Sequence, residues 1–377
     1  MTAAEPAPAI EWGPAGATAP PLDLDALEAE ARERLPPMAY DFFAGGAHDE
    51  ITLRENRRAF HRLALRPRVL RGVGSRDLST TLLGGRRPHP ICISPMAFHG
   101  MAHKDGELAT ARAAAATGTT LAVSLFSNAA IEEVRAASDA PLWSHVYVFR
   151  DRGVTRELVE RVEGAGVEAL VVTVDAPLYG HRPRDVRNGF RLPAHLDVGT
   201  LRAAAGGRLD PAATGAELDE FFLSQVDPAL TWRDVDWLRS LTSLPLLLKG
   251  ILRGDDAAIA VEHGAAGVIV SNHGGRQLDT AVPSVTALPE VVDAVAGRAD
   301  VLLDSGVRRG TDVLKALALG ARAVMVGRPV IWGLAAGGEA GVAQVLLGLR
   351  AELDLAMALS GASSTAAVSP DLLALPS

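Results

Sequence analysis

The chain has 377 residues, of which 48% are hydrophobic and 22% are charged, and its formal net charge is −8. A chain of this length can form one large domain or two ordinary ones, and the apolar fraction is ample for a large core. The acidic balance argues against nucleic acid as the main partner. The single cysteine, Cys92, excludes an internal disulfide and a multi-cysteine metal site.

Neither a signal peptide nor a membrane span is expected. The first residues lack a basic start and an apolar core, and no run reaches about 18 apolar residues. We therefore expect a cytoplasmic protein without a membrane partner. Residues 1–22 are rich in Pro, Ala and Gly and are expected to form a disordered tail.

Two helices and eight strands are predicted after this tail. Residues 23–35 place apolar groups at helical spacing behind Asp23, and residues 37–47 form a second amphipathic segment. Short apolar runs follow, most of them separated by Ala-rich helical segments, at 91–94, 120–124, 142–148, 169–174, 245–249, 267–271, 300–305 and 323–326. Such runs are typical of parallel strands that are buried on both faces.

Eight strands alternating with helices predict a (β/α)8 TIM barrel at residues 23–370, with the two early helices as an N-terminal extension. An open, doubly wound sheet has the same alternation and stays as the alternative. A long insertion, residues 178–235, follows the fourth strand and includes a short helical piece at 215–224. It predicts either a lid over the catalytic face or a surface excursion.

The C-terminal ends of the last two strands resemble a phosphate site. Gly306 and Gly327 admit close approach of the backbone, and Arg308 and Arg328 can bind phosphate oxygens with paired donors. This is also the usual position of phosphate in a (β/α)8 barrel. Pairing of the two arginines with surface carboxylates is the alternative.

Three other strand ends carry candidates for chemistry. Lys249 closes an apolar strand and needs an anionic partner, in a salt bridge or on a cofactor ring, unless it forms a Schiff base. His273 and Asp175 suit an acid-base pair, and the guanidinium of Arg276 suits a substrate carboxylate. A purely structural His273 is the alternative. No second His or carboxylate cluster has metal-ligand spacing, so we expect no metal.

The segment SNHGGRQLD at residues 271–279 resembles the signature of the FMN-dependent L-2-hydroxy acid oxidases and dehydrogenases, which include glycolate, lactate and mandelate enzymes. The resemblance runs from about residue 24 to about residue 365. It also rests on LPPMAYDFFAGGA, SPMAFHGMAHKDGE, TVDAP, LPLLLKGI and GVRRGTDVLKALALGA. These motifs occur in the family's order.

The resemblance implies FMN as cofactor and assigns roles to individual positions. His273 would act as the base and Asp175 would support it. The substrate would contact Tyr40, Tyr147, Arg182 and Arg276. FMN would contact Pro95, Met96, Ala97, Ser124, His145, Thr173, Lys249, Ser271, Asp304, Gly306, Arg308, Gly327 and Arg328.

Four positions depart from the family pattern. His145 stands where the family usually has Gln at the flavin pyrimidine edge, and Ser305 replaces a usual Gly, which we expect to be a mild change. Phe126 stands where some members have Trp, and Phe98 where enzymes of small acids often have a non-aromatic residue. Phe98 and Phe126 permit an aromatic, mandelate-like substrate, unless they are ordinary packing residues.

The family resemblance implies oxidation of an L-2-hydroxy acid to the 2-oxo acid, with electrons passed to oxygen or another acceptor. An FMN barrel with a non-redox or monooxygenase outcome and a non-catalytic ligand-binding barrel are the alternatives. The resemblance also implies a homo-oligomer, with a tetramer as the family's common form.

Overall fold

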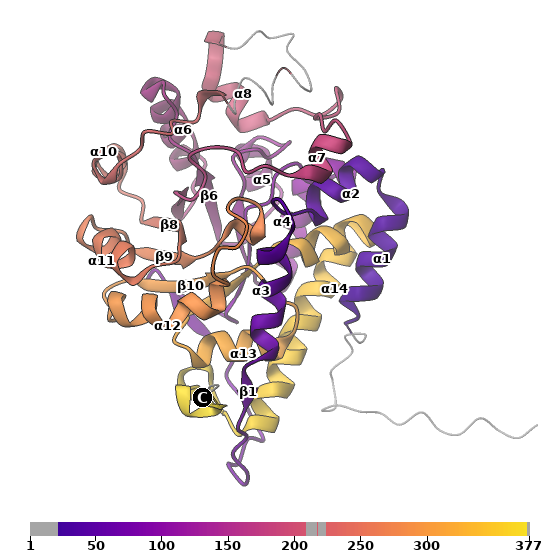
Figure 1. Ribbon diagram of the computed structural model, residues 1–377, viewed down its shortest axis with the longest axis vertical. Helices are drawn as coiled ribbons and strands as arrows, with labels where there is room; N and C mark the ends of the chain where they lie inside the picture. Colours follow the sequence, from indigo (N-terminus) through magenta and orange to yellow (C-terminus); the bar gives the residue numbers. More distant parts are fainter. Residues whose placement is uncertain (1–21, 209–216, 218–223, 375–377) are drawn as a thin grey trace, which may run out of the picture.

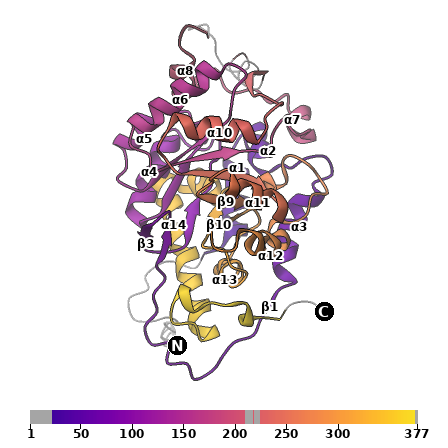
Figure 2. The same ribbon diagram turned by 90° about the vertical axis from the view of Figure 1, so that its left-hand side faces the viewer.

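The computed structural model describes residues 22–208, 217 and 224–374. Eight parallel strands close a barrel in the order β10-β11-β4-β5-β6-β7-β8-β9, and helices surround it (Figure 1, Figure 2). The predicted (β/α)8 barrel is confirmed, and closure between β9 and β10 excludes the open sheet.

The barrel elements lie where the apolar runs predict them. The strands are β4 (Ile91–Ile93), β5 (Thr120–Val123), β6 (Leu142–Val146), β7 (Ala169–Thr173), β8 (Leu246–Ile251), β9 (Gly267–Val270), β10 (Asp300–Asp304) and β11 (Ala323–Val326). The helices that follow them are α4 (Gly106–Thr117), α5 (Ile131–Ala136), α6 (Arg152–Gly164), α10 (Trp232–Leu241), α11 (Gly254–Glu262), α12 (Ser284–Val295), α13 (Gly310–Ala318) and α14 (Arg328–Ser360).

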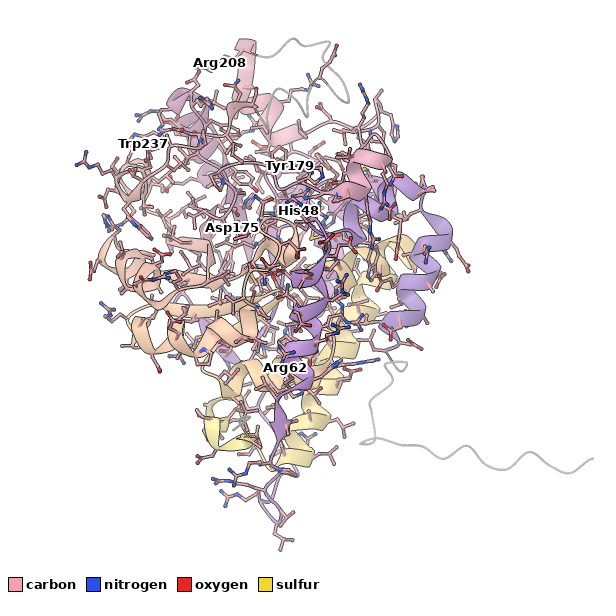
Figure 3. The ribbon with its side chains drawn as sticks, in the orientation of Figure 1. His48, Arg62, Asp175, Tyr179, Arg208 and Trp237 are labelled. Atoms are coloured by element: carbon pink, nitrogen blue, oxygen red, sulfur yellow. The ribbon has the colours of Figure 1, made fainter. Side chains whose placement is uncertain are left out.

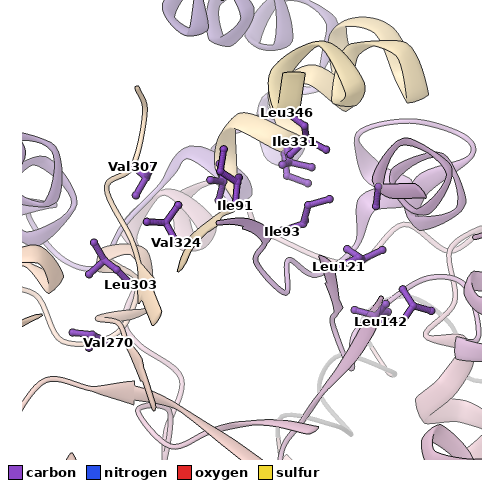
Figure 4. Close-up of a cluster of buried hydrophobic side chains, with 14 of the residues drawn as sticks. Ile91, Ile93, Leu121, Leu142, Val270, Leu303, Val307, Val324, Ile331 and Leu346 are labelled. Atoms are coloured by element: carbon purple, nitrogen blue, oxygen red, sulfur yellow. The ribbon is translucent and has the colours of Figure 1, made fainter. Parts of the chain in front are cut away.

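Side chains alternate along each barrel strand between two separate cores. One alternate set packs together inside the barrel and includes Cys92, Trp143, Leu247 and Met325. The other set packs outward against the helices, and Figure 4 shows part of it, such as Ile93 and Leu303. Because the period of a strand is two residues, continuing the inward set toward the strand ends brings the polar residues there into one place.

The N-terminal extension covers one side and the base of the barrel. Helix α1 (Leu24–Arg34) begins at Asp23, whose carboxylate accepts the N–H of Ala26 at 3.0 Å, and it packs on α14. Helices α2 (Pro37–Ala44) and α3 (Ile51–His61) follow. A hairpin of β2 (Thr80–Leu82) and β3 (Gly85–Arg87) inserts Leu82 into the inner core.

The ends of the predicted domain differ slightly from the expectation. The expected tail lies outside the described residues except for Leu22, which is buried. At the other end, β12 (Leu373–Ala374) pairs with β1 (Ala64–Leu65), so the fold continues past residue 370. Short 3-10 helices are η1 (His99–Met101), η2 (Gly206–Arg208), η3 (His273–Gly275), η4 (Thr365–Ala367) and η5 (Pro370–Leu372).

The insertion after β7 contributes helices α7 (Pro183–Arg187) and α8 (Gly199–Ala205) above the barrel, near the top of Figure 1. Helix α8 packs on α6. Nearly all of the helical piece predicted at 215–224 lies outside the described residues.

Helix α14 is the one helix in the described part of the chain that is long and apolar enough to cross a membrane. However, 61% of its most apolar window is buried inside the protein. The helix is also interrupted at Gly337 and Gly338, whose backbone angles are not helical. Core helices of this kind meet the same length and composition criteria.

Asp279 ties the loop after β9 to the start of α3. Its buried carboxylate accepts the backbone N–H groups of Asp49, Ile51 and Thr52 at 2.8–3.3 Å. Burial opposes ionisation of this carboxyl, but the N–H donors outweigh it and hold the pKa below its usual value. The carboxylate thus stabilises a helix N-terminus that lies 228 residues away from it in the sequence.

We expect Asp279→Ala to lower the free energy of unfolding at pH 7 by about 2 kcal/mol, because three N–H donors lose their acceptor. Urea denaturation measures this loss. A lowered folded-state pKa stabilises the protein above the unfolded-state pKa, and this contribution disappears as pH falls through the folded-state value. The difference between the variant and the parent should therefore shrink in acid. Asp293→Ala, on the exposed face of α12, is the control, and an equal loss there would contradict the assignment.

Candidate active site

A cavity of about 340 Å³ opens at the C-terminal ends of the barrel strands. Most predicted site residues line it together: Pro95, Met96, Ala97, Phe98, Ser124, Phe126, His145, Tyr147, Thr173, Arg182, Lys249, His273, Arg276, Asp304, Gly306, Arg308, Gly327 and Arg328. Asp175 and Ser271 lie behind this lining and hydrogen-bond to it. The volume is in the range of small-molecule sites.

His273 and Asp175 form the predicted pair. His273 Nδ1 lies 2.9 Å from Asp175 Oδ1, and Asp175 is labelled in Figure 3. The ring nitrogen donates to the carboxylate, which leaves Nε2 as the basic nitrogen. Gly250 makes this arrangement possible, because its φ is 113° and a Cβ there would meet the Asp175 side chain at 2.5 Å.

The surroundings of His273 keep its imidazole uncharged near neutrality. Burial lowers its pKa below the ordinary value, the adjacent Asp175 carboxylate opposes this effect, and the cations Lys249 and Arg182 lower the pKa further. An unprotonated imidazole can accept a proton, and the carboxylate beside it stabilises the imidazolium that forms.

Lys249 belongs to a buried network of four strand ends. Its ammonium lies 3.3 Å from Asp304 Oδ2 and donates to Ser271 Oγ at 3.2 Å. Ser271 and Ser94 in turn donate to the two oxygens of Asp304 at 2.7 and 2.6 Å. Burial opposes ionisation of Asp304, but Lys249 and the two serines outweigh it and lower its pKa. The predicted salt bridge of Lys249 is therefore present, and Lys249 still lines the cavity.

Two guanidinium groups lie close together without a strong carboxylate partner. Arg276 donates to the carbonyl oxygens of Phe42 and Gly45, and Arg182 Nε donates to the carbonyl of Arg276 at 3.2 Å. Burial, and then the charge of Arg182, lower the pKa of Arg276 to about 10, so Arg276 stays cationic at neutral pH. The nearest acid to Arg182 is Asp185, at 3.9 Å. This part of the cavity therefore suits an anion.

The structure contradicts the substrate contact predicted for Tyr40. Its hydroxyl donates to Glu28 at 3.3 Å, its ring stacks on Trp332, and it does not line the cavity. Phe42 lines the cavity instead. Residues two apart point about 200° away from each other around a helix, so Tyr40 and Phe42 leave α2 on opposite sides.

The predicted phosphate arginines both reach the cavity. Arg328 is held by the carbonyls of Phe43, Gly274 and Gly45 at 2.8–3.0 Å, and Arg308 donates to the carbonyl of Val307. Burial and neighbouring arginines lower the pKa of Arg328 to about 9, and burial and Arg57 lower that of Arg308 to about 10. Among the lining residues that the structure describes, there are six Lys or Arg side chains and one carboxylate.

Aromatic rings form a continuous wall on one side of the cavity. The ring centroids of Phe42 and Phe98 are 5.6 Å apart, those of Phe98 and Phe126 are 6.0 Å apart, and those of Phe126 and Tyr147 are 5.9 Å apart. Phe98 has a left-handed φ of 59°, which is unfavourable for a bulky residue, and its N–H donates to the carbonyl of Phe126. Strained residues of this kind tend to gather at functional sites.

The backbone of Ser305 is also strained, while the mild effect expected for this change stays a prediction. Its φ of 89° lies in the region that favours glycine. Its hydroxyl accepts the N–H of Gly274 at 3.0 Å and lies 3.4 Å from Asp304 Oδ2. These contacts offset part of the strain.

The sequence did not single out several residues that the cavity uses. Leu178, Tyr179, Ser224, Val226 and Pro228 of the insertion line it, as the lid interpretation requires, although lid motion stays a prediction. Tyr179, which is labelled in Figure 3, hydrogen-bonds Arg182, and the guanidinium of Arg182 lies 4.0 Å from the ring centroid of Tyr179. Ser94 lies two residues after the inward-facing Cys92, so the two-residue period of a strand predicts that Ser94 also points inward. No feature of the sequence points to Tyr179.

The donor set of the cavity fits FMN. Arg308, Arg328 and the start of the long helix α14 can hold a phosphate, because helix N-termini and guanidinium groups both bind anions. Asp304 offers acceptors for ribityl hydroxyls. Lys249 and the backbone around Met96 can face the ring. In the described part of the chain, no group of three or more His, Cys, Asp or Glu could hold a metal ion.

Comparisons with known proteins agree with this geometry. A family model described as FMN-dependent dehydrogenase matches residues 31–375. The chain is 52% identical over 347 residues to L-lactate oxidase from Nostoc sp., covering 91% of this chain and 95% of that protein. It is 48% identical over 347 residues to glycolate oxidase from Spinacia oleracea, covering 92% and 94%.

The solved structures lead to the same family. A crystal structure of mandelate oxidase with (S)-4-hydroxymandelic acid superposes with a TM-score of 0.86 at 43% identity, covering 93% of this chain and 98% of that chain. The chain therefore belongs to the FMN-dependent dehydrogenase family and is an FMN-dependent 2-hydroxy acid oxidase or dehydrogenase.

Proposed function

We propose that the enzyme oxidises an L-2-hydroxy acid with an aromatic side chain to the 2-oxo acid and passes the electrons to oxygen. One observation carries the choice of substrate: the ring wall of Phe42, Phe98 and Phe126 lies beside the paired guanidinium groups of Arg276 and Arg182. A molecule with a carboxylate at one end and an aryl group at the other complements both features.

The carboxylate end would bind Arg276 and Arg182. Arg276 is oriented by two backbone carbonyls and lies with its guanidinium 4.8 Å from the ring centroid of Phe42. A planar guanidinium binds a carboxylate through two parallel hydrogen bonds, which fixes the orientation of the substrate as well as its position. Burial is the chief cause that raises the pKa of Tyr147. Its hydroxyl therefore stays protonated and can donate a hydrogen bond to the substrate.

The aryl end would contact Phe98 and Phe126. Aromatic pairs prefer offset or edge-to-face contacts at centroid distances of about 4.5–7 Å, and such contacts stabilise beyond the area they bury. The strained backbone of Phe98 points its ring into this wall, which a simple packing role would not require. The side chain of glycolate or lactate is too small to make such ring contacts with Phe98 and Phe126.

The residues of the chain would move the protons and stabilise the charge. The oxidation removes two electrons and two protons from the alcohol carbon and its oxygen. FMN, when bound, would take both electrons with one proton as a hydride equivalent, which leaves one proton for the protein to accept. His273 Nε2 would accept one proton, and Asp175 would stabilise the resulting imidazolium. The ammonium of Lys249 would stabilise negative charge on the cofactor ring.

Oxygen is the acceptor that the relatives favour, since those at 52% and 48% identity are named oxidases. Membership of this family favours redox chemistry over the non-redox FMN barrel and the non-catalytic barrel. Cytoplasmic location and a homo-oligomer stay proposals drawn from the sequence.

A substrate screen tests the proposed function. Under anaerobic conditions (S)-mandelate should bleach the flavin absorbance, and in air it should release peroxide. We expect its kcat/KM to exceed those of L-lactate and glycolate at least tenfold, because the aromatic contacts are worth more than about 1.4 kcal/mol. A preference for lactate or glycolate would refute the aryl assignment, and no bleaching by any 2-hydroxy acid would refute the activity itself.

Asp175→Asn should lower kcat by 10²–10⁴-fold while FMN content is retained, because the amide cannot stabilise the imidazolium. The pH profile should also change. His273 must be unprotonated, so activity falls as pH drops through its lowered pKa; without the Asp175 charge this acidic limb moves to still lower pH. Asp236→Asn is the control, because it breaks an Asp–His pair with His263 of 2.8 Å outside the cavity. Similar losses in both variants would argue against the proposed role.

Arg276→Lys should raise KM for the hydroxy acid by about tenfold or more, because an ammonium cannot form the paired contact with a carboxylate. Steady-state kinetics at several substrate concentrations measures the effect. Arg253→Lys, at the exposed Arg253–Asp255 pair, serves as the control and should leave KM unchanged. An unchanged KM in Arg276→Lys would move the carboxylate site elsewhere.

A further inference from the structure

His145 is a buried residue of the cavity lining that contacts groups from its two neighbouring strands. Its side chain is buried on β6, where Nδ1 lies 3.4 Å from the backbone N–H donor of Leu125 and Nε2 lies 2.8 Å from Thr173 Oγ1 on β7. Both ring nitrogens are therefore engaged by the protein itself. The ring is also packed edge-on against Tyr147, with centroids 4.7 Å apart.

These contacts determine which nitrogen of His145 carries the proton. A backbone N–H can only donate, so Nδ1 must accept from Leu125. The neutral imidazole then has its single proton on Nε2 and donates it to the Thr173 oxygen. A doubly protonated ring would direct a second proton against the Leu125 N–H. Burial first, and then the charge of the Lys249 ammonium, hold the pKa of His145 well below its ordinary value, in agreement with this geometry.

The hydrogen bond from His145 determines the direction of the Thr173 hydroxyl. Because Thr173 Oγ1 accepts the Nε2 proton, its own proton must point away from the imidazole. Thr173 lines the cavity, and no second partner of its hydroxyl is found in the part of the chain that the structure describes. The proton is thus directed into the space that the donor set assigns to FMN.

The neighbouring strand places a second donor next to this one. Thr173 on β7 is paired in register with Lys249 on β8, and the ammonium of Lys249 lines the same cavity. A hydroxyl proton and an ammonium therefore face the cavity from adjacent strands. Donors to a ring that becomes negatively charged on reduction stabilise the reduced form more than the oxidised form.

We propose that His145 is a positioning residue that fixes Thr173 as a hydrogen-bond donor to the flavin ring and so raises the reduction potential of FMN. His145 acts as an uncharged group and only through Thr173. The proposal rests on FMN binding, and it does not depend on which hydroxy acid is oxidised.

A double-mutant cycle on the FMN-loaded enzyme tests this coupling. Thr173→Val removes the donor, and His145→Leu leaves the Thr173 hydroxyl free to turn. Each single variant should weaken the preference for reduced over oxidised FMN about tenfold, which lowers the midpoint potential by about 30 mV for a two-electron couple. Each should also raise the Kd for FMN, measured by quenching of flavin fluorescence. The double variant should resemble Thr173→Val alone.

Two outcomes of the cycle would overturn the proposal: additive effects of the two changes, or an unchanged potential in His145→Leu. In a Thr173→Ser background, which keeps the hydroxyl, His145→Leu should retain its effect.

Because His145→Leu could fail to fold, ¹⁵N NMR of histidine-labelled enzyme gives a second test. The His145 signals, assigned by their loss in His145→Gln, should show an unprotonated Nδ1 and a protonated Nε2 from pH 6 to 8. A protonated Nδ1 in this range would refute the proposal.

Discussion

The two-residue alternation of side chains inside a closed barrel is the constraint on which the rest of the structure depends. It places Cys92, Trp143 and Leu247 in the inner core, and the same alternation, one step further along, turns His145 and Lys249 into the cavity. The catalytic face is therefore the last inward layer of the barrel. A shift of one residue in any strand would exchange polar cavity residues for the outward-facing apolar ones.

Much of this arrangement could be predicted from the sequence because it follows from pattern. Apolar runs located the strands to within one or two residues, and reading the strand ends in order assembled most of the cavity. Tyr40 shows where pattern fails. A short helix such as α2 is largely buried, so its sequence does not say whether Tyr40 or Phe42 faces the cavity, and only packing against Trp332 and Glu28 decides it.

Backbone strain at the site could not be read from residue types. Phe98, His273 and Ser305 all adopt positive φ angles without being glycine. Each is held by a specific contact: the carbonyl of Phe126 binds the N–H of Phe98, Ser271 binds that of His273, and Ser305 binds Gly274. The strained residues thus carry an aromatic wall, the base and the phosphate loop, which is where precise placement matters most.

The end of α2 joins the two anion sites of the cavity. Gly45 offers its carbonyl to both Arg276 and Arg328, and the carbonyls of Phe42 and Phe43 complete the two sets. A helix C-terminus carries partial negative charge, so it stabilises both cations while leaving their net charge uncancelled. Burial first, and then the charges of neighbouring arginines, lower the pKa values of both groups. An anion that binds at either site neutralises part of this net positive charge. Because Arg276 and Arg328 share the carbonyl of Gly45, each site also supports the position of the other.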